Sequence, residues 1–218
     1  MKTFLRNNGL SICFLALFIV TLLGQIFFGF EEHNKELIQE GSAAINLSAY
    51  LVSGHFLQST FENWESEFLQ MALFLIFTMF LVQRGSAESK DPDKEEDVDK
   101  EPNPRKKDAP WPVKKGGWIR SLYEHSLCYT FTLLFLLSFW IHWRGSLKDF
   151  NEEQVLKRLP TESGTQYLGN PRFWFESFQN WQSEFLSLFA MVVLSIFLRE
   201  KGSPQSKPVD APNSQTGK

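Results

Sequence analysis

The chain has 218 residues and a formal net charge of −3, which is too small an excess to indicate nucleic-acid binding or an acidic substrate. Its mean hydropathy of −0.20 averages a charged middle and tail with long apolar stretches, in which most of the 22 phenylalanines lie. The local pattern therefore outweighs the average and is typical of an integral membrane protein.

The first apolar stretch runs without a charge from Asn7 to Phe30, after Lys2 and Arg6. It is about as long as the ~20 residues that a membrane-spanning helix needs. A cleaved secretory signal peptide is the alternative, but no small-residue cleavage site follows. We therefore predict a retained transmembrane helix over about residues 9–30.

A second helix is predicted after a polar connection, with Ser53 as its N-terminal cap. It contains the phrase F-E-N-W-E-S-E-F-L at Phe61–Leu69 and ends near Arg84-Gly85. A cation followed by glycine suits the C-terminus of a helix. The uncharged run 68–82 is too short to span alone, so the predicted span is 63–84.

Composition changes after Gly85, where prolines and charges of both signs replace apolar residues. Such a segment buries too little surface to offset the entropy of ordering it. Residues 86–117 are therefore predicted to be a disordered cytoplasmic linker between a first repeat, 1–85, and a second repeat, 118–201. A polar, proline-containing tail, 202–218, is predicted to be disordered for the same reason.

The second repeat is predicted to span the membrane at about 122–143 and 180–200. Asn170 followed by Pro171 indicates a capped helix start, because proline lacks an N–H group that would need a partner there. This helix carries F-Q-N-W-Q-S-E-F-L at Phe178–Leu186, which is 117 residues after the first copy of the phrase.

The internal repeat extends beyond this phrase. Tyr50–Lys90 and Tyr167–Lys207 match without a gap at the same spacing, with 16 identities in 41 positions. Each half contains two predicted spans, so both halves enter the membrane from the same side. The predicted fold is an all-α integral membrane protein with four transmembrane helices, arranged as a tandem, parallel repeat of two helices.

Lysine and arginine counts predict the orientation. The N-terminus, the segment 84–120 and the tail hold 16 of them, whereas the two connections within the repeats hold six. Because Lys and Arg are enriched in cytoplasmic loops, both termini and the linker are predicted to lie in the cytoplasm.

The repeated phrase places polar side chains on one face of each predicted helix, near the outer surface of the bilayer. These stripes should face protein rather than lipid. In one hypothesis Glu67 and Glu184 face each other and bind a cation or exchange a proton. In the other, the stripes pack helices together or reach to the membrane interface. Trp64 and Trp181 are predicted interface anchors. The stripes comprise Asn63, Ser66, Glu67, Gln70, Asn180, Ser183, Glu184 and Ser187.

Several stretches resemble a family of uncharacterised bacterial integral membrane proteins, a domain of unknown function. They include F-E-N-W-E-S-E-F-L-Q, A-P-W-P-V-K-K-G-G-W and F-W-F-E-S-F-Q-N-W-Q-S-E-F-L-S, and the resemblance covers nearly the whole chain. It implies a bacterial cell inner membrane location and supplies no activity, substrate or catalytic residue.

No catalytic motif, phosphate loop or dinucleotide fingerprint is present, so an enzyme is not expected. The two cysteines and four histidines lack ligand spacing, and no metal or cofactor is predicted. The leading hypothesis is a non-enzymatic structural or interaction component. Its expected partners are the lipid bilayer and a second copy or another membrane protein, not nucleic acid. The alternative is a small ion, proton or solute transporter or channel using Glu67 and Glu184.

Overall fold

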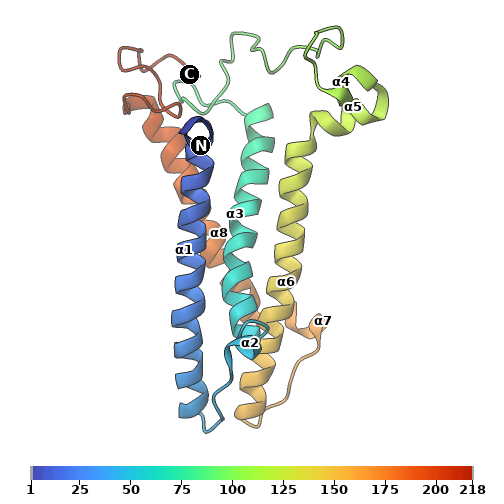
Figure 1. The fold of residues 1–218 in the computed structure, drawn as a ribbon, viewed down its shortest axis with the longest axis vertical. Coiled ribbons are helices and arrows are strands. Elements are labelled where there is room, and N and C mark those ends of the chain that lie inside the picture. The colour runs from blue at the N-terminus through green and yellow to red at the C-terminus, as the bar shows by residue number, and fades with distance from the viewer. Residues whose placement is uncertain (1, 218) are drawn as a thin grey trace. The chain divides into compact units, whose positions relative to one another are not determined.

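The computed structural model describes residues 2–217, and every regular element in that range is an α-helix (Figure 1). This confirms the predicted all-helical class. Met1 and Lys218, the outer ends of the predicted first repeat and tail, lie outside the described residues. The helices are α1 (Lys2–Gln39), α2 (Leu47–Tyr50), α3 (Gly54–Phe80), α4 (Trp111–Lys115), α5 (Gly117–Glu124), α6 (Ser126–Leu156), α7 (Gly164–Tyr167) and α8 (Pro171–Phe197).

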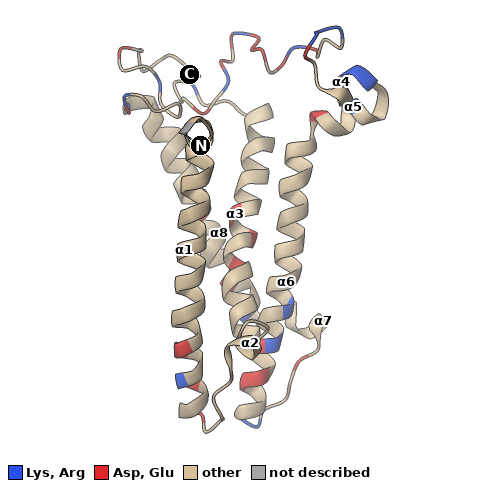
Figure 2. Ribbon diagram, in the orientation of Figure 1, with Lys and Arg blue, Asp and Glu red and all other residues tan. Residues whose placement is uncertain are grey.

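Three of the described helices, rather than the four predicted, are long and apolar enough to cross a membrane: α1, α6 and α8. The missing one is α3, which carries Glu62, Glu65 and Glu67 part-way along its length (Figure 2). It also ends at Phe80, so the apolar Leu81 and Val82 lie beyond it. Three carboxylates and the early end together lower the hydropathy of the helical segment.

Helix α1 continues without a break past the predicted span 9–30, through the charged residues that follow it. Residues 3–21 are exposed, and all of the acidic residues of the helix lie toward its C-terminal end (Figure 2). The end is a turn in which the Ser42 N–H donates to the Leu37 carbonyl at 2.8 Å. Gly41 has φ of +81° there, a conformation that glycine adopts without steric cost.

The chain divides into two compact units, the first formed by residues 2–61 and 141–173 and the second by 62–140 and 174–217. Helices α3, α6 and α8 each contribute residues to both units. The largest side chains buried in the first unit are Tyr50, Tyr167 and Phe173.

Two glycines bring α3 against α6 in the first unit. A Cβ atom added to Gly54 would lie 2.2 Å from the amide nitrogen of Asp149, and one on Gly145 would lie 2.7 Å from that of Gln58. The two backbones therefore approach too closely for any side chain at these positions. Such close approach through small residues is how membrane helices gain packing contacts.

Matching hydrogen bonds recur at a spacing of 117 residues. The side chain of Asn34 exchanges two bonds with the backbone of Ile45, at 2.7 and 3.1 Å. Asn151 does the same with Glu162, at 2.8 and 2.9 Å. The four-residue helices α2 and α7 and the long helices α3 and α8 also begin 117 positions apart.

The predicted helix caps are confirmed. The Oγ atom of Ser53 accepts a bond from the Phe56 amide at 3.1 Å, at the start of α3. The Oδ1 atom of Asn170 accepts one from the Arg172 amide at 2.9 Å, at the start of α8. Each cap satisfies an N–H group that has no partner within its own helix.

In the second unit, the segment from Ser86 to Pro110 forms turns, with ion pairs such as Lys90–Asp99 at 2.7 Å. The ammonium group of Lys207 is buried and donates to the backbone carbonyls of Gly85 and of three further residues, Ile196, Asn213 and Gln215. The disorder expected of the linker and tail stays a prediction.

Candidate functional site

The two polar stripes predicted from the repeated phrase lie on α3 and α8, within the second unit. They meet at Gln70, which is buried. Its Nε2 atom donates to the backbone carbonyl of Glu184 and to the Oγ atom of Ser187, both at 2.9 Å. One side chain of the first stripe thus bonds directly to the second.

Other members of the stripes bond within their own helices. The hydroxyl of Ser66 donates to the Asn63 carbonyl, and that of Ser183 donates to the Asn180 carbonyl, both at 2.8 Å. The side-chain amide of Asn180 donates to the carbonyl of Glu176 at 3.1 Å. These bonds satisfy the polar groups without a ligand.

Glu67 and Glu184, the pair proposed for ion binding, differ in exposure. Glu67 is exposed and Glu184 is partly buried. The charge of Glu67 nevertheless acts on Glu184, so the two carboxylates lie close enough to interact. Among the described residues, no hydrogen bond joins the two carboxyl groups. The bonds between α3 and α8 at this level are those that Gln70 donates to the backbone carbonyl of Glu184 and to Ser187.

The buried carboxylate on this stretch of α3 is Glu65, which the predicted stripe left out. It has no exposed surface, and its Oε1 atom accepts a hydrogen bond from the indole Nε1 of Trp181 at 2.9 Å. At about 100° per residue, Glu65 lies about 160° around α3 from both Asn63 and Glu67, whereas Gln70 lies within about 60° of both.

Trp181 packs into protein rather than standing alone at the surface. Its ring lies 5.4 Å from that of Phe178 and 6.4 Å from that of Phe135, between ring centroids. Trp64 is also partly buried. The role of the two tryptophans as interface anchors stays a prediction, and Trp181 has a packing role in addition.

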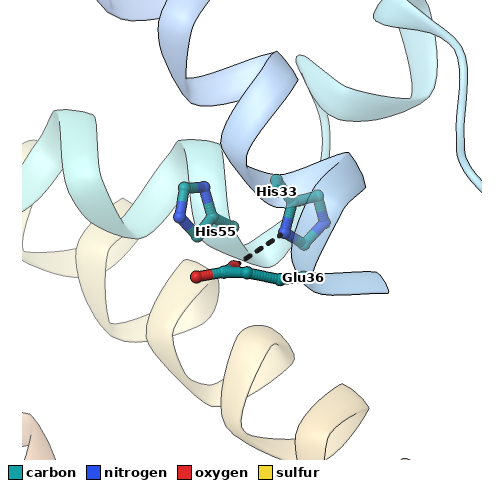
Figure 3. Close-up of side chains that lie close together, drawn as sticks. All are labelled: His33, Glu36 and His55. Carbon is teal, nitrogen blue, oxygen red and sulfur yellow. Dashed lines mark ion pairs between the residues drawn. The ribbon is translucent and has the colours of Figure 1, made fainter. Parts of the chain in front are cut away.

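A second polar cluster, which was not predicted from the sequence, lies in the first unit and consists of His33, Glu36 and His55 (Figure 3). One ligand atom from each side chain lies within 4.8 Å of the others. The two imidazole rings stack with centroids 4.8 Å apart and planes 23° apart. The Nδ1 atom of His33 is 3.9 Å from Oε2 of Glu36.

This cluster borders a cavity of about 490 Å³ between α1, α3, α6 and the start of α8. Arg172 forms ion pairs there with Asp149 and Glu153, both at 2.7 Å. Five carboxylates and one guanidinium line the cavity, so its charge favours a cation.

Tyr50 holds the two histidines from one side. It is fully buried, and its ring centroid lies 5.8 Å from that of His33 and 6.0 Å from that of His55. Gly29 leaves room for it, because a Cβ there would lie 2.2 Å from the Tyr50 hydroxyl. Burial, with a smaller contribution from the charge of Glu36, raises the pKa of Tyr50, so the phenol stays neutral.

The sequence held one local signal for this cluster. His33 and Glu36 are three residues apart and therefore share a face of α1. Nothing local relates them to His55, which comes from the next long helix and approaches only because α1 and α3 pack around Tyr50. Two imidazoles and a carboxylate together provide donors suited to a metal cation.

Comparisons with known proteins place the chain in one family and supply no relative of known activity. No curated protein and no solved structure matches it. All of the chain, residues 1–218, matches the family described as a domain of unknown function (DUF6766). The resemblance to an uncharacterised family is thereby confirmed, and the chain belongs to the DUF6766 family.

Proposed function

We propose that the chain is a multi-pass protein of the bacterial inner membrane that acts as a non-enzymatic structural or interaction component. The observation that carries this proposal is that polar side chains of α3 and α8 form hydrogen bonds with one another. Gln70 of α3 bonds to the backbone and to Ser187 of α8, and Trp181 of α8 bonds to Glu65 of α3. Polar side chains that bond to a neighbouring helix stabilise helix packing, and this use favours a structural role over a permeation path.

The proposal includes α3 as a fourth membrane helix. Its 27 residues would extend roughly 40 Å, which exceeds the ~30 Å of the hydrocarbon core. Its hydropathy is reduced by groups that have partners in the protein, since Glu65 is buried against Trp181 and Gln70 against α8. A polar group satisfied inside a bundle does not face lipid.

A tandem duplication is the simplest origin of this arrangement. It is supported by the common spacing of 117 residues, which relates α2 to α7, α3 to α8, and the Asn34 bonds to those of Asn151. With two spans in each half, the linker and both termini lie on one side. The 16 to 6 division of Lys and Arg favours the cytoplasmic side.

Flux measurements in liposomes test the structural role against transport. The full chain, reconstituted, is expected to leave proton, sodium and potassium leak rates equal to those of protein-free liposomes. The variant Glu67→Gln/Glu184→Gln is expected to behave as the wild type does. A leak that appears with the wild-type protein and is lost in this variant would establish the transporter instead.

A further inference from the structure

The cluster of His33, Glu36 and His55 has the composition of a metal site. Two imidazole nitrogens and one carboxylate oxygen are the protein ligands found in many zinc sites with an open position. We propose that these three side chains bind one divalent transition-metal ion of the zinc type, at the place where the end of α1 meets the start of α3.

The distances fit with a small adjustment. Ligands about 2.0–2.1 Å from a tetrahedral zinc ion lie about 3.3 Å from one another. The His33 Nδ1 and Glu36 Oε2 atoms are already 3.9 Å apart, and all three ligand atoms lie within 4.8 Å. We expect rotation of the His55 side chain out of its stacked position to bring its ligand nitrogen closer to the other two ligand atoms.

The surroundings of His55 favour a bound cation. Its Nδ1 atom is buried and has no hydrogen-bond partner among the described residues. The buried carboxyl group of Asp149, on α6, lies close enough to His55 for the two side chains to interact electrostatically. Arg172 offsets part of the acidic charge but is engaged by Asp149 and Glu153. A metal ion would give the buried nitrogen a partner and offset the carboxylates that Arg172 leaves unbalanced.

The framework around the ligands is fixed by packing. His33 and Glu36 lie on one face of α1, and His55 is in the first turn of α3, which Ser53 caps. Gly54, next to His55, lets that turn lie against the backbone of α6. The adjacent cavity of about 490 Å³ leaves room for water in the remaining coordination position.

Metal titration of the full chain in detergent tests the site, with zinc ions as the probe and a purification tag that contains no histidine. One zinc ion per chain is expected to bind the wild type. Cobalt substitution is expected to give the absorption of a tetrahedral ion with nitrogen and oxygen ligands. Replacing His55 by cysteine, His55→Cys, should retain binding and add a thiolate-to-cobalt charge-transfer band, which only a direct ligand produces.

Loss-of-ligand variants have matched controls in the same chain. Glu36→Gln and the double variant His33→Gln/His55→Gln are expected to weaken zinc affinity by more than about 100-fold, the upper range for outer partners of a site. Glu32→Gln, one turn away on α1, and His125→Gln, at the end of α5, are expected to leave it unchanged. Because Glu36 is exposed, its replacement does not threaten folding.

The site is disproved if the wild type binds no zinc, or if Glu36→Gln and the double histidine variant bind zinc as the wild type does. It is also disproved if His55→Cys binds cobalt without the thiolate band. The flux assay has a separate outcome, so failure of the metal site leaves the proposed structural role standing.

Discussion

Gln70 joins the polar stripe of α3 to the polar stripe of α8. Within a bilayer, a buried amide cannot exchange its bonds for water, so its partners must come from protein. Gln70 finds two on α8, the Glu184 carbonyl and the Ser187 hydroxyl. Ser187 itself also donates to the Glu184 carbonyl at 2.8 Å, so the three groups form one small network.

A double-mutant cycle measures this contact. Gln70→Ala, Ser187→Ala and the combined variant are expected to give a coupling free energy of about 0.6 kcal/mol, with about 1.7 kcal/mol as the upper end for hydrogen bonds between membrane helices. The measurement is reversible unfolding in mixed micelles. Glu67→Gln, at an exposed position of the same helix, serves as the control and should change stability little. Additive effects of the two alanine substitutions would mean that the bond contributes nothing.

The polar residues of the repeated phrase were predicted from the sequence only in part. The predicted stripes included both Gln70 and Ser187, which bond to each other in the structure, but this pair was not predicted. The prediction favoured Glu67, whereas the fully buried carboxylate is Glu65. Hydrophobic periodicity indicates which residues share a helix face but does not fix how the helix is rotated in the bundle. That rotation is set by partners such as Trp181, which come from far along the chain.

At the scale of elements, the close contact between α3 and α6 depends on glycine at two positions, Gly54 and Gly145, where a side chain would not fit. Gly145→Ala would place a Cβ 2.7 Å from the Gln58 amide nitrogen and 2.8 Å from the Leu57 Cβ. Backbone atoms must move to relieve the overlap, and overpacking of this kind costs about 1–3 kcal/mol. We expect Gly145→Ala to lower the temperature of unfolding in detergent.

Gly24→Ala on α1 is the matched control. It makes the same chemical change at a helical glycine that has no atom within 4 Å of the added Cβ. Alanine has the higher helix propensity, so this variant should be neutral or slightly stabilising. If both variants lowered the temperature of unfolding equally, the effect of Gly145→Ala would come from the substitution within a helix and not from the contact with α3.

The sequence predicted which segments form helices more accurately than it predicted where each helix ends. Capping residues located the starts of α3 and α8, since Ser53 and Asn170 act through neighbouring amides. Helix α1 runs to Gln39, past charged residues that indicated a connection, because a helix can continue out of an apolar layer into water. The cluster around His55 could not be predicted, because its members meet only through packing of separate helices.

At the scale of the whole molecule, the membrane status of α3 decides which side every later segment occupies. The proposed four spans put the linker and tail on one side and both repeat connections on the other. If α3 does not cross, the three spans α1, α6 and α8 reverse the side of every segment after α3. A single set of labelling measurements therefore separates the two arrangements.

Single cysteines at exposed positions report these sides in intact cells. Cys13 and Cys128 are first replaced by serine, and Ala43→Cys, Glu95→Cys, Thr161→Cys or Ser214→Cys is then added. With four spans and a cytoplasmic N-terminus, a membrane-impermeant maleimide should label positions 43 and 161 at once. Positions 95 and 214 should react only after the cells are opened. With three spans, 43, 95 and 214 would react at once and 161 would be protected, because the helix pair of the first repeat would no longer return the chain to its starting side.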